Sequence, residues 1–359
     1  MKGLNMRIAA TAALALFLGA GLASGAHAEL RKFDMTIEEF DFEVAPGLTT
    51  KVWAYDGQVP GPLIHVREGD DVEVTVQNNT TMSHTIHFHG TYQTGTWQMD
   101  GVPDVSQKAI EPGDSFTYRF VADKPGSLWY HCHVNTAEHI DLRGMWGPMI
   151  VDPKHPTRLE KQVTKDAIVM FAGWDSAVAK EYGKNDVPKR DLDYFSINGK
   201  SHPGNQPIRV KKGDVLRLRL YAPNSPVAFH LHGHDALVTH KDGLPITPYP
   251  VDVIAMQPGE RYDLIVHMNN PGIWMAHDHI EEHTTAGGKE GAGSMLVVEY
   301  EGIEKPDFYM WKGVQYDPDF YMSESLKKPY GKHNNPGFMG FDPSSPRPAA
   351  AKAPAHVGM

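Results

Sequence analysis

The chain has 359 residues, of which 22% are charged, and its formal net charge is −10 at pH 7. This acidic balance argues against binding to nucleic acid or to an anionic membrane surface. The chain contains a single cysteine, Cys132, so no internal disulfide is expected. The length favours two domains over one.

Residues 1–28 have the features of a secretory signal peptide. Lys2 and Arg7 give the N-terminal segment a positive charge, and an apolar run follows them. Ala26-His27-Ala28 then fits the small-x-small rule for signal-peptide cleavage. The apolar run is short for a membrane span, and no second run of spanning length follows. We therefore expect a periplasmic or secreted protein without a membrane anchor.

The rest of the chain repeats one β unit. Residues 66–76 and 210–220 both contain a Gly-Asp turn followed by alternating apolar positions, and each segment leads to a His-x-His-Gly motif. Alternation with period two and Gly/Pro turns predict an all-β fold of two antiparallel sandwiches. We place them at residues 29–155 and 165–300. Residues 301–359 form an extension whose end, rich in proline and alanine, is expected to be disordered.

Four His-x-His pairs occupy matching positions of the repeat. On a strand, both imidazoles of such a pair face the same side. Imidazole binds copper, zinc, iron and nickel, and eight imidazoles without carboxylates favour copper. The pairs are His87/His89, His131/His133, His230/His232 and His277/His279.

A second metal site is predicted on the opposite face of the same strands. Cys132 lies between His131 and His133, so its thiol points away from both imidazoles. His84 lies three residues before His87, and this odd spacing places it on the face that Cys132 uses.

His139 and Met145 follow Cys132 in the chain. Two histidines, one cysteine and a weak methionine form the ligand set of blue-copper sites. Met149 is a nearby competitor for the methionine position, and either methionine alone would more often be a core residue.

From residue 35 to residue 300 the chain resembles the multicopper oxidases, and among them the two-domain, laccase-like enzymes. The resemblance implies two tandem cupredoxin domains and four copper ions: one type 1 (blue) copper and a trinuclear site. It also implies a homotrimer, in which domain 1 of one subunit and domain 2 of the next share each trinuclear site. The implied ligands are His84, Cys132, His139 and Met145 for type 1 copper, His87 and His230 for type 2 copper, and His89, His131, His133, His232, His277 and His279 for the type 3 pair.

Domain 2 lacks a blue-copper site in this interpretation. Val227 stands where His84 stands in domain 1, and Asp278 replaces Cys132 between the second pair of histidines. His283 remains where a blue-site histidine could stand, and without a thiolate its expected role is at the surface or in hydrogen bonding. The one type 1 copper is therefore expected in domain 1.

The resemblance also implies an activity, in which electrons from a small reducing substrate cross Cys132 to the trinuclear site and reduce dioxygen to water. The substrate class stays open among phenols, aromatic amines and metal ions. Asp100 and Glu281 match family acids that relay protons, although each could be an ordinary turn or solvated carboxylate.

Two alternatives remain open. Copper nitrite reductases share the implied fold and trimer, but they carry aspartate at the position of His87 and no histidine at that of His133. The other alternative is a cupredoxin that binds copper or transfers electrons without catalysis.

Overall fold

The computed structural model describes residues 28–45, 48–177, 191–304, 310–311, 314–315 and 339–341. The predicted signal peptide, except Ala28, and most of the predicted C-terminal extension lie outside these residues. Within them, α1 (Thr136–His139) is the one α-helix and nearly all other regular structure is β-strand. The described residues include no helix with the length and apolar character that a membrane crossing requires.

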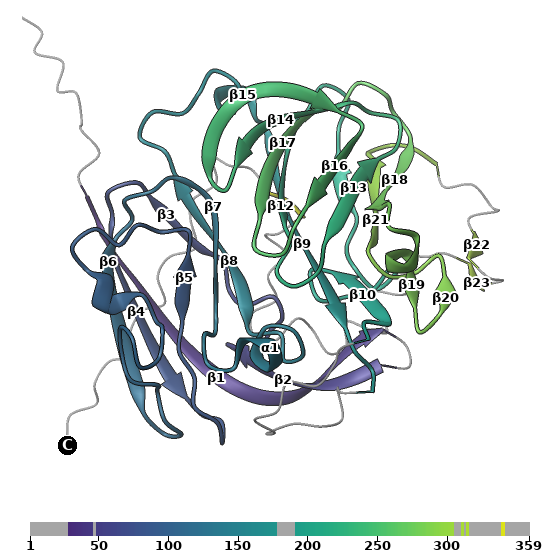
Figure 1. Ribbon diagram of the computed structural model, residues 1–359. Helices are drawn as coiled ribbons and strands as arrows, with labels where there is room; N and C mark the ends of the chain where they lie inside the picture. Colours follow the sequence, from purple (N-terminus) through teal and green to yellow (C-terminus); the bar gives the residue numbers. More distant parts are fainter. Residues whose placement is uncertain are drawn as a thin grey trace, which may run out of the picture.

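The N-terminal half folds into two four-stranded sheets that face each other (Figure 1). One has the order β2-β1-β4-β6 and the other the order β3-β8-β7-β5. The strands are β1 (Leu30–Ala45), β2 (Leu48–Tyr55), β3 (Ile64–Arg67), β4 (Asp71–Asn78), β5 (His87–His89), β6 (Ser115–Val121), β7 (Gly126–His131) and β8 (Trp146–Asp152), with the 3-10 turn η1 at Trp97–Met99.

The C-terminal half repeats this plan with larger sheets. In the described residues, the order β15-β14-β17-β12-β9-β10-β19-β20 forms one sheet, and β11-β21-β18-β13-β16 forms the other. The first strands are β9 (Lys165–Trp174), β10 (Tyr194–Ile197), β11 (Ile208–Val210), β12 (Val215–Tyr221), β13 (Val227–Leu231), β14 (Ala236–Lys241) and β15 (Leu244–Val251). The others are β16 (Val253–Met256), β17 (Arg261–His267), β18 (Ile273–Asp278), β19 (Thr285–Ala286), β20 (Lys289–Glu290) and β21 (Met295–Tyr300).

Short elements complete the description. The 3-10 turns η2 (Glu160–Gln162) and η4 (Glu281–Thr284) precede β9 and β19. Three short strands come from the segment predicted as an extension, and one of them, β24, pairs with β9. These strands are β22 (Met310–Trp311), β23 (Val314–Gln315) and β24 (Met339–Phe341).

The prediction of an all-β fold with two sandwiches is confirmed, but the sandwiches are mixed rather than purely antiparallel. The pairs β1–β4 and β3–β8 are parallel, and so are β9–β12 and β11–β21 in the second half. The physical reason is connectivity, since the chain crosses to the opposite sheet before it returns beside its first strand. The same crossover occurs in both halves.

Alternating side chains bury both faces of β7. Leu128 and Tyr130 belong to the core of the N-terminal sandwich, whereas Trp129 packs in the hydrophobic layer between the two sandwiches. Cys132 joins the same core as Leu128 and Tyr130. Side chains along β7 thus alternate between its two faces, and Cys132, just after the strand, continues this alternation as predicted.

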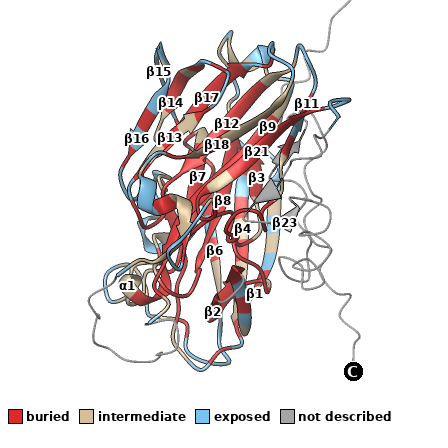
Figure 2. Ribbon diagram, turned by 90° about the vertical axis from the view of Figure 1, so that its right-hand side faces the viewer, coloured by how far each residue is buried: buried red, intermediate tan, exposed pale blue. Residues whose placement is uncertain are grey.

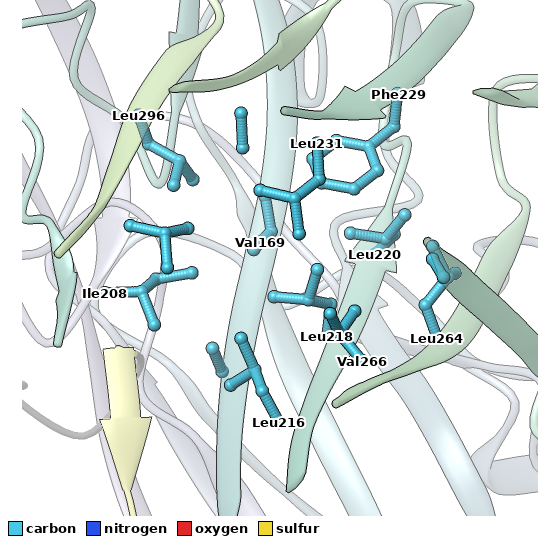
Figure 3. Packing of buried hydrophobic residues seen from close by; sticks show 14 of the residues in the cluster. Val169, Ile208, Leu216, Leu218, Leu220, Phe229, Leu231, Leu264, Val266 and Leu296 are labelled. Carbon is cyan, nitrogen blue, oxygen red and sulfur yellow. The ribbon is translucent and has the colours of Figure 1, made fainter. Parts of the chain in front are cut away.

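Strand β9 is buried on both faces for the same reason. Val169 and Phe171 point into the core of the C-terminal sandwich, which Figure 3 shows around Leu218, and Met170 packs in the layer between the sandwiches. Strand β15, in contrast, is largely exposed, and Figure 2 shows buried residues concentrated in the interior. A continuous apolar layer thus joins the two sandwiches.

A buried ionic cluster reinforces that contact. Asp166 on β9 binds the guanidinium groups of Arg217 and Arg219, and Arg219 also contacts Ser127 on β7 at 2.8 Å. Ser127 donates a hydrogen bond to Asp263 at 2.5 Å. Burial alone would raise the pKa of Asp166, but the two guanidinium groups hold it at about 2. The cluster ties the strand that leads to Cys132 to the C-terminal sandwich.

Asp166→Ala is expected to lower the free energy of unfolding at pH 7 by about 3–5 kcal/mol, because two buried guanidinium groups lose their carboxylate. The folded-state pKa of Asp166 lies below its ordinary value of 3.8. Its stabilising contribution is therefore complete above that value and is lost as the pH falls towards about 2.

Urea unfolding from pH 7 to acid measures this contribution. Glu73→Ala, which removes surface ion pairs with Lys32 and Arg119, serves as the control and should cost less than about 1 kcal/mol. Equal costs for both variants would contradict the assignment.

Candidate metal centre

Three of the predicted type 1 ligands meet at one point inside the N-terminal sandwich. The Cys132 Sγ lies 3.1 Å from His139 Nδ1 and 3.8 Å from His84 Nδ1, and the two nitrogens are 3.3 Å apart. All three side chains are fully buried. They come from the end of β7, from α1 and from the segment before β5, so residues 55 positions apart in sequence converge.

The hydrogen bonds of His84 leave Nδ1 free to bind a metal. Thr80 donates its hydroxyl to Asn78 Oδ1 at 2.8 Å and therefore accepts from His84 Nε2 at 2.7 Å. Burial lowers the pKa of His84 to about 2, and repulsion from His139 acts in the same direction. Burial also lowers the pKa of His139 to about 3, with a further contribution from Arg143. Both imidazoles are therefore neutral, as metal ligation requires.

Met145 is buried in the same core cluster as Cys132. Its carbonyl accepts a hydrogen bond from Cys132 N at 3.1 Å, and its own N–H donates to the His139 carbonyl at 3.0 Å. The backbone thus links Met145 to both ligands. Met149, the competitor, lies on β8 opposite Leu128 of β7.

Trp53 covers the histidines of this cluster. Its ring packs edge-on against His84 and His139, with centroids 5.5 Å and 4.9 Å away. Its indole N–H donates to Glu39 on β1 at 2.9 Å. Both Trp53 and His139 are fully buried, so neither ring reaches the surface of the described chain.

The donor set fits copper. Burial raises the pKa of the Cys132 thiol to about 11, so a thiolate at neutral pH needs a cation beside it. The sulfur and the two histidine nitrogens lie within 4.8 Å of one another. Two neutral imidazoles and one thiolate, with methionine nearby, are the donors of blue-copper sites.

The first four paired histidines also come together, on the opposite side of the strand. His87 pairs with His131 across β5 and β7, and their ring centroids are 5.2 Å apart. His133 lies 5.5 Å from His87, and His89 lies 5.7 Å from His131. Burial, with a smaller contribution from Arg261, lowers the pKa of His89 to about 3.

The second quartet repeats this geometry. His230 pairs with His277 across β13 and β18, and their ring centroids are 5.7 Å apart. The Nε2 atoms of His232 and His277 approach to 3.1 Å. His279 completes the group, 5.3 Å from His277. We call these groups the first and second histidine quartets.

Backbone carbonyls orient one histidine of each pair. His131 Nδ1–H donates to the Cys132 carbonyl at 2.8 Å, and His277 Nδ1–H donates to the Asp278 carbonyl at 2.9 Å. A carbonyl can only accept, so Nδ1 carries the proton and Nε2 keeps its lone pair for a metal. His87 is held in the same way by the Asp100 carbonyl at 2.7 Å.

Asp100, one of the two predicted proton-relay acids, contacts His87. Its carboxylate lies 3.3 Å from His87 Nδ1. Glu281 lies in η4, two residues after His279, with its side chain exposed. The structure therefore brings Asp100 into contact with a quartet histidine. Glu281 is close to the second quartet in sequence, and its exposed side chain lies at the start of η4.

Sequence reasoning missed Asp252. Its carbonyl accepts from His230 Nδ1–H at 3.1 Å, and its carboxylate lies 3.3 Å from the same nitrogen. This repeats the contact of Asp100 with His87. The repeat was the available signal, but loops of different length separate each aspartate from its histidine, so the two did not align in sequence.

The two quartets of one chain form separate groups of side chains. Among the described residues, the ring contacts of each quartet join members of that quartet and not of the other. In the second quartet, His232 and His279 are exposed. Each chain thus carries two distinct groups of four histidines.

Two family models match the chain. One described as multicopper oxidase covers residues 36–156, and another with the same description covers residues 173–289. Together they match more than half of the sequence. The chain belongs to the multicopper oxidase family, whose members use copper, as the resemblance predicted.

Known proteins support this assignment. Laccase-5 of Trametes villosa is 34% identical over 254 residues, which are 66% of this chain and 47% of that protein. The chain spans about half the length of the curated relatives it matches.

Solved structures resemble the chain over nearly their whole length. The multicopper oxidase mgLAC has 57% identity and a TM-score of 0.78, over 87% of this chain and 99% of that chain. The blue copper oxidase from Nitrosomonas europaea has 51% identity and a TM-score of 0.78, over 88% and 100%. A copper nitrite reductase from Nitrosomonas europaea, 23% identical with a TM-score of 0.63, shares the fold. The predicted resemblance to the multicopper oxidases is confirmed, and the comparison with the nitrite reductase shows a shared fold.

Proposed function

We propose that this protein is a multicopper oxidase that couples one-electron oxidation of a small reducing substrate to four-electron reduction of dioxygen to water. The observation that carries the proposal is the pairing of His84, Cys132 and His139 on one face of the strand end with His131 and His133 on the other. Family membership supports it independently.

The proposed ligands are those that the family resemblance implies, and the contacts among the histidines and Cys132 support them. His84, Cys132, His139 and Met145 hold type 1 copper. The two quartets hold the trinuclear site, with His87 and His230 at type 2 copper and the remaining six histidines at the type 3 pair. Bound copper would supply one-electron redox chemistry at Cys132, and dioxygen binding and reduction between the quartets.

The protein connects the two sites through very few atoms. Cys132 is covalently linked to His131 and His133, and its carbonyl also accepts the His131 Nδ1–H at 2.8 Å. This sulfur therefore has both a covalent and a hydrogen-bonded route to quartet histidines. The counterpart Asp278 has no sulfur, so the proposed electron path belongs to the N-terminal sandwich.

We propose a homotrimer in which the first quartet of one subunit faces the second quartet of the next. Among the described residues, no ring contact joins the two quartets of one chain, and exposed apolar residues lie beside both. Trp97 of η1 is 61% exposed near Asp100, and Val253, opposite His230 on the paired strand, is 42% exposed. A second copy would cover these residues and complete the site.

The reductant and the location are also proposals. Phenols, aromatic amines and metal ions remain the candidate substrate classes, with dioxygen as the acceptor. Export to the periplasm or beyond, directed by residues 1–28, suits a chain whose lone thiol is buried and ligated rather than paired in a disulfide.

Oxygen consumption by the copper-loaded, full-length protein tests the proposal. We expect uptake of dioxygen with a phenol or aromatic amine, an intense blue thiolate-to-copper absorption band and about four copper ions per subunit. Consumption of nitrite instead of dioxygen would support the reductase alternative. Copper binding and reversible reduction without any turnover would support the electron-transfer alternative.

Asp100 and Glu281 are proposed as proton-relay acids for water formation. Asp100→Ala is expected to slow oxygen turnover by about 100-fold or more, the range of general acid catalysis, and Glu281→Ala to slow it similarly. The blue band should stay unchanged, because neither side chain belongs to the type 1 ligands. Copper content is measured beside turnover, because the Asp100 carboxylate lies 3.3 Å from His87 Nδ1. Turnover is measured across pH. Unaltered turnover at every pH would contradict the assignment for that residue.

A further inference from the structure

A buried Asp–His pair lies behind the second quartet, where the N-terminal sandwich has its blue-copper ligands. Asp278 is 1% exposed and His283 is 9% exposed. His283 Nδ1–H donates to Asp278 Oδ2 at 2.7 Å, and the ring of Phe195 stacks on the imidazole with centroids 4.0 Å apart. Of the two roles expected for His283, the hydrogen-bonding role is the one observed.

The second oxygen of Asp278 ties two chain segments together. Its Oδ1 accepts hydrogen bonds from Ala228 N at 2.8 Å and from Ile280 N at 3.1 Å. Ala228 lies on β13, two residues before His230, and Ile280 follows His279 directly. A buried carboxylate is costly without partners, and these three hydrogen bonds satisfy it.

In the N-terminal sandwich, the Cys132 thiol makes the contacts that the Asp278 carboxylate makes here. Thr85 lies two residues before His87, and its N–H donates to Cys132 Sγ at 3.5 Å. Cys132 Sγ also contacts His139 at 3.1 Å. Asp278 therefore takes both the place of Cys132 and the amide contact of its thiol. His283 takes the place of His139 as the imidazole partner.

The pair acts on the orientation of quartet histidines. His277 Nδ1–H donates to the Asp278 carbonyl at 2.9 Å, and His279 N donates to the Ala228 carbonyl at 2.7 Å. Loss of the carboxylate would release Ala228 N on β13, which carries His230, and Ile280 N, which follows His279. Partners behind a metal ligand typically affect metal affinity by about 10–100-fold.

We propose that Asp278 and His283 are positioning residues, a metal-free clamp that holds the second quartet in the geometry of the trinuclear site. In the C-terminal sandwich the clamp takes the place of the link that His84, Cys132 and His139 would form through bound copper in the N-terminal one. This inference rests on the proposed function, because it requires that the second quartet bind copper.

Copper affinity of full-length variants tests the clamp. Asp278→Ala should weaken binding of copper to the trinuclear site by about 10–100-fold, measured by competition with a copper chelator. The blue band should persist, since Cys132 is untouched, while the type 2 resonance in electron paramagnetic spectra changes or disappears. Asp278→Asn should recover most of the affinity, because an amide oxygen still accepts from Ala228 and Ile280.

Asp152→Ala is the matched control. It breaks the Asp152–His65 contact of 3.0 Å at the far end of β8 from Trp146, which pairs with His131. Equal loss of thermal stability in Asp152→Ala and Asp278→Ala, with full copper loading in both, would overturn the clamp. Absence of type 2 and type 3 copper from the unaltered protein would instead overturn the proposed function, and the clamp with it.

Discussion

Cys132→Ser is expected to abolish the blue absorption band and to reduce oxidase turnover to below about 1% of the unaltered protein, a loss of about 2.7 kcal/mol of transition-state stabilisation or more. Serine keeps the size of the side chain but supplies no thiolate. The absorption band and the proposed electron path both depend on that sulfur. Visible absorption, copper content and oxygen uptake measure the result.

Copper content separates this effect from general damage. The eight quartet histidines are unchanged in Cys132→Ser, so the trinuclear site should still fill while type 1 copper is lost. Met149→Leu is the control, a conservative change of a buried methionine on β8 that should keep both the band and the turnover. A Cys132→Ser protein that remained blue, or that consumed dioxygen normally, would contradict the assignment.

Mixing two inactive variants should restore activity if neighbouring subunits share each trinuclear site. His133→Ala damages the first quartet and His279→Ala damages the second, so each variant alone should be inactive. In randomly mixed trimers, about a quarter of the shared sites combine two intact quartets, and about a quarter of the activity should return. Oxygen uptake after co-expression in equal amounts measures this recovery.

The control mixes two variants that damage the same quartet. His131→Ala with His133→Ala leaves no intact first quartet, so no activity should return whichever subunits meet. If the mixture of His133→Ala and His279→Ala also stays inactive although mixed oligomers form, the trinuclear site lies within a single chain. The lack of ring contacts between the two quartets in the described part of the chain argues against that outcome.

Much of the metal chemistry could be predicted from spacing alone. Alternation along a strand separated Cys132 from His131 and His133, and the structure confirms that they lie on opposite sides. The repeat showed that His87 and His230 occupy equivalent positions, and that Asp278 stands where the first half has Cys132. Local periodicity suffices here because neighbouring strand residues point to fixed, opposite directions.

Other features needed the folded chain. Spacing could not show that Trp53 covers His84 and His139, since strand β2 reaches them only through sandwich packing. The sequence pattern also could not align Asp252 with Asp100, because the loops before the two aspartates differ in length. In the structure, each carboxylate lies 3.3 Å from the Nδ1 atom of its histidine. The expectation of antiparallel sheets failed at four parallel pairs, which arise from connections between sheets rather than from local pattern.

The sequence by itself determined the residue types at the two metal sites, the number of histidine pairs and the single sulfur that can link them. Those properties depend on short-range spacing and side-chain chemistry. Only the tertiary structure decided that each quartet assembles from two paired strands and that Asp278 and His283 form a buried hydrogen-bonded pair. Those properties depend on which distant strands meet, and that is set by packing of the whole core.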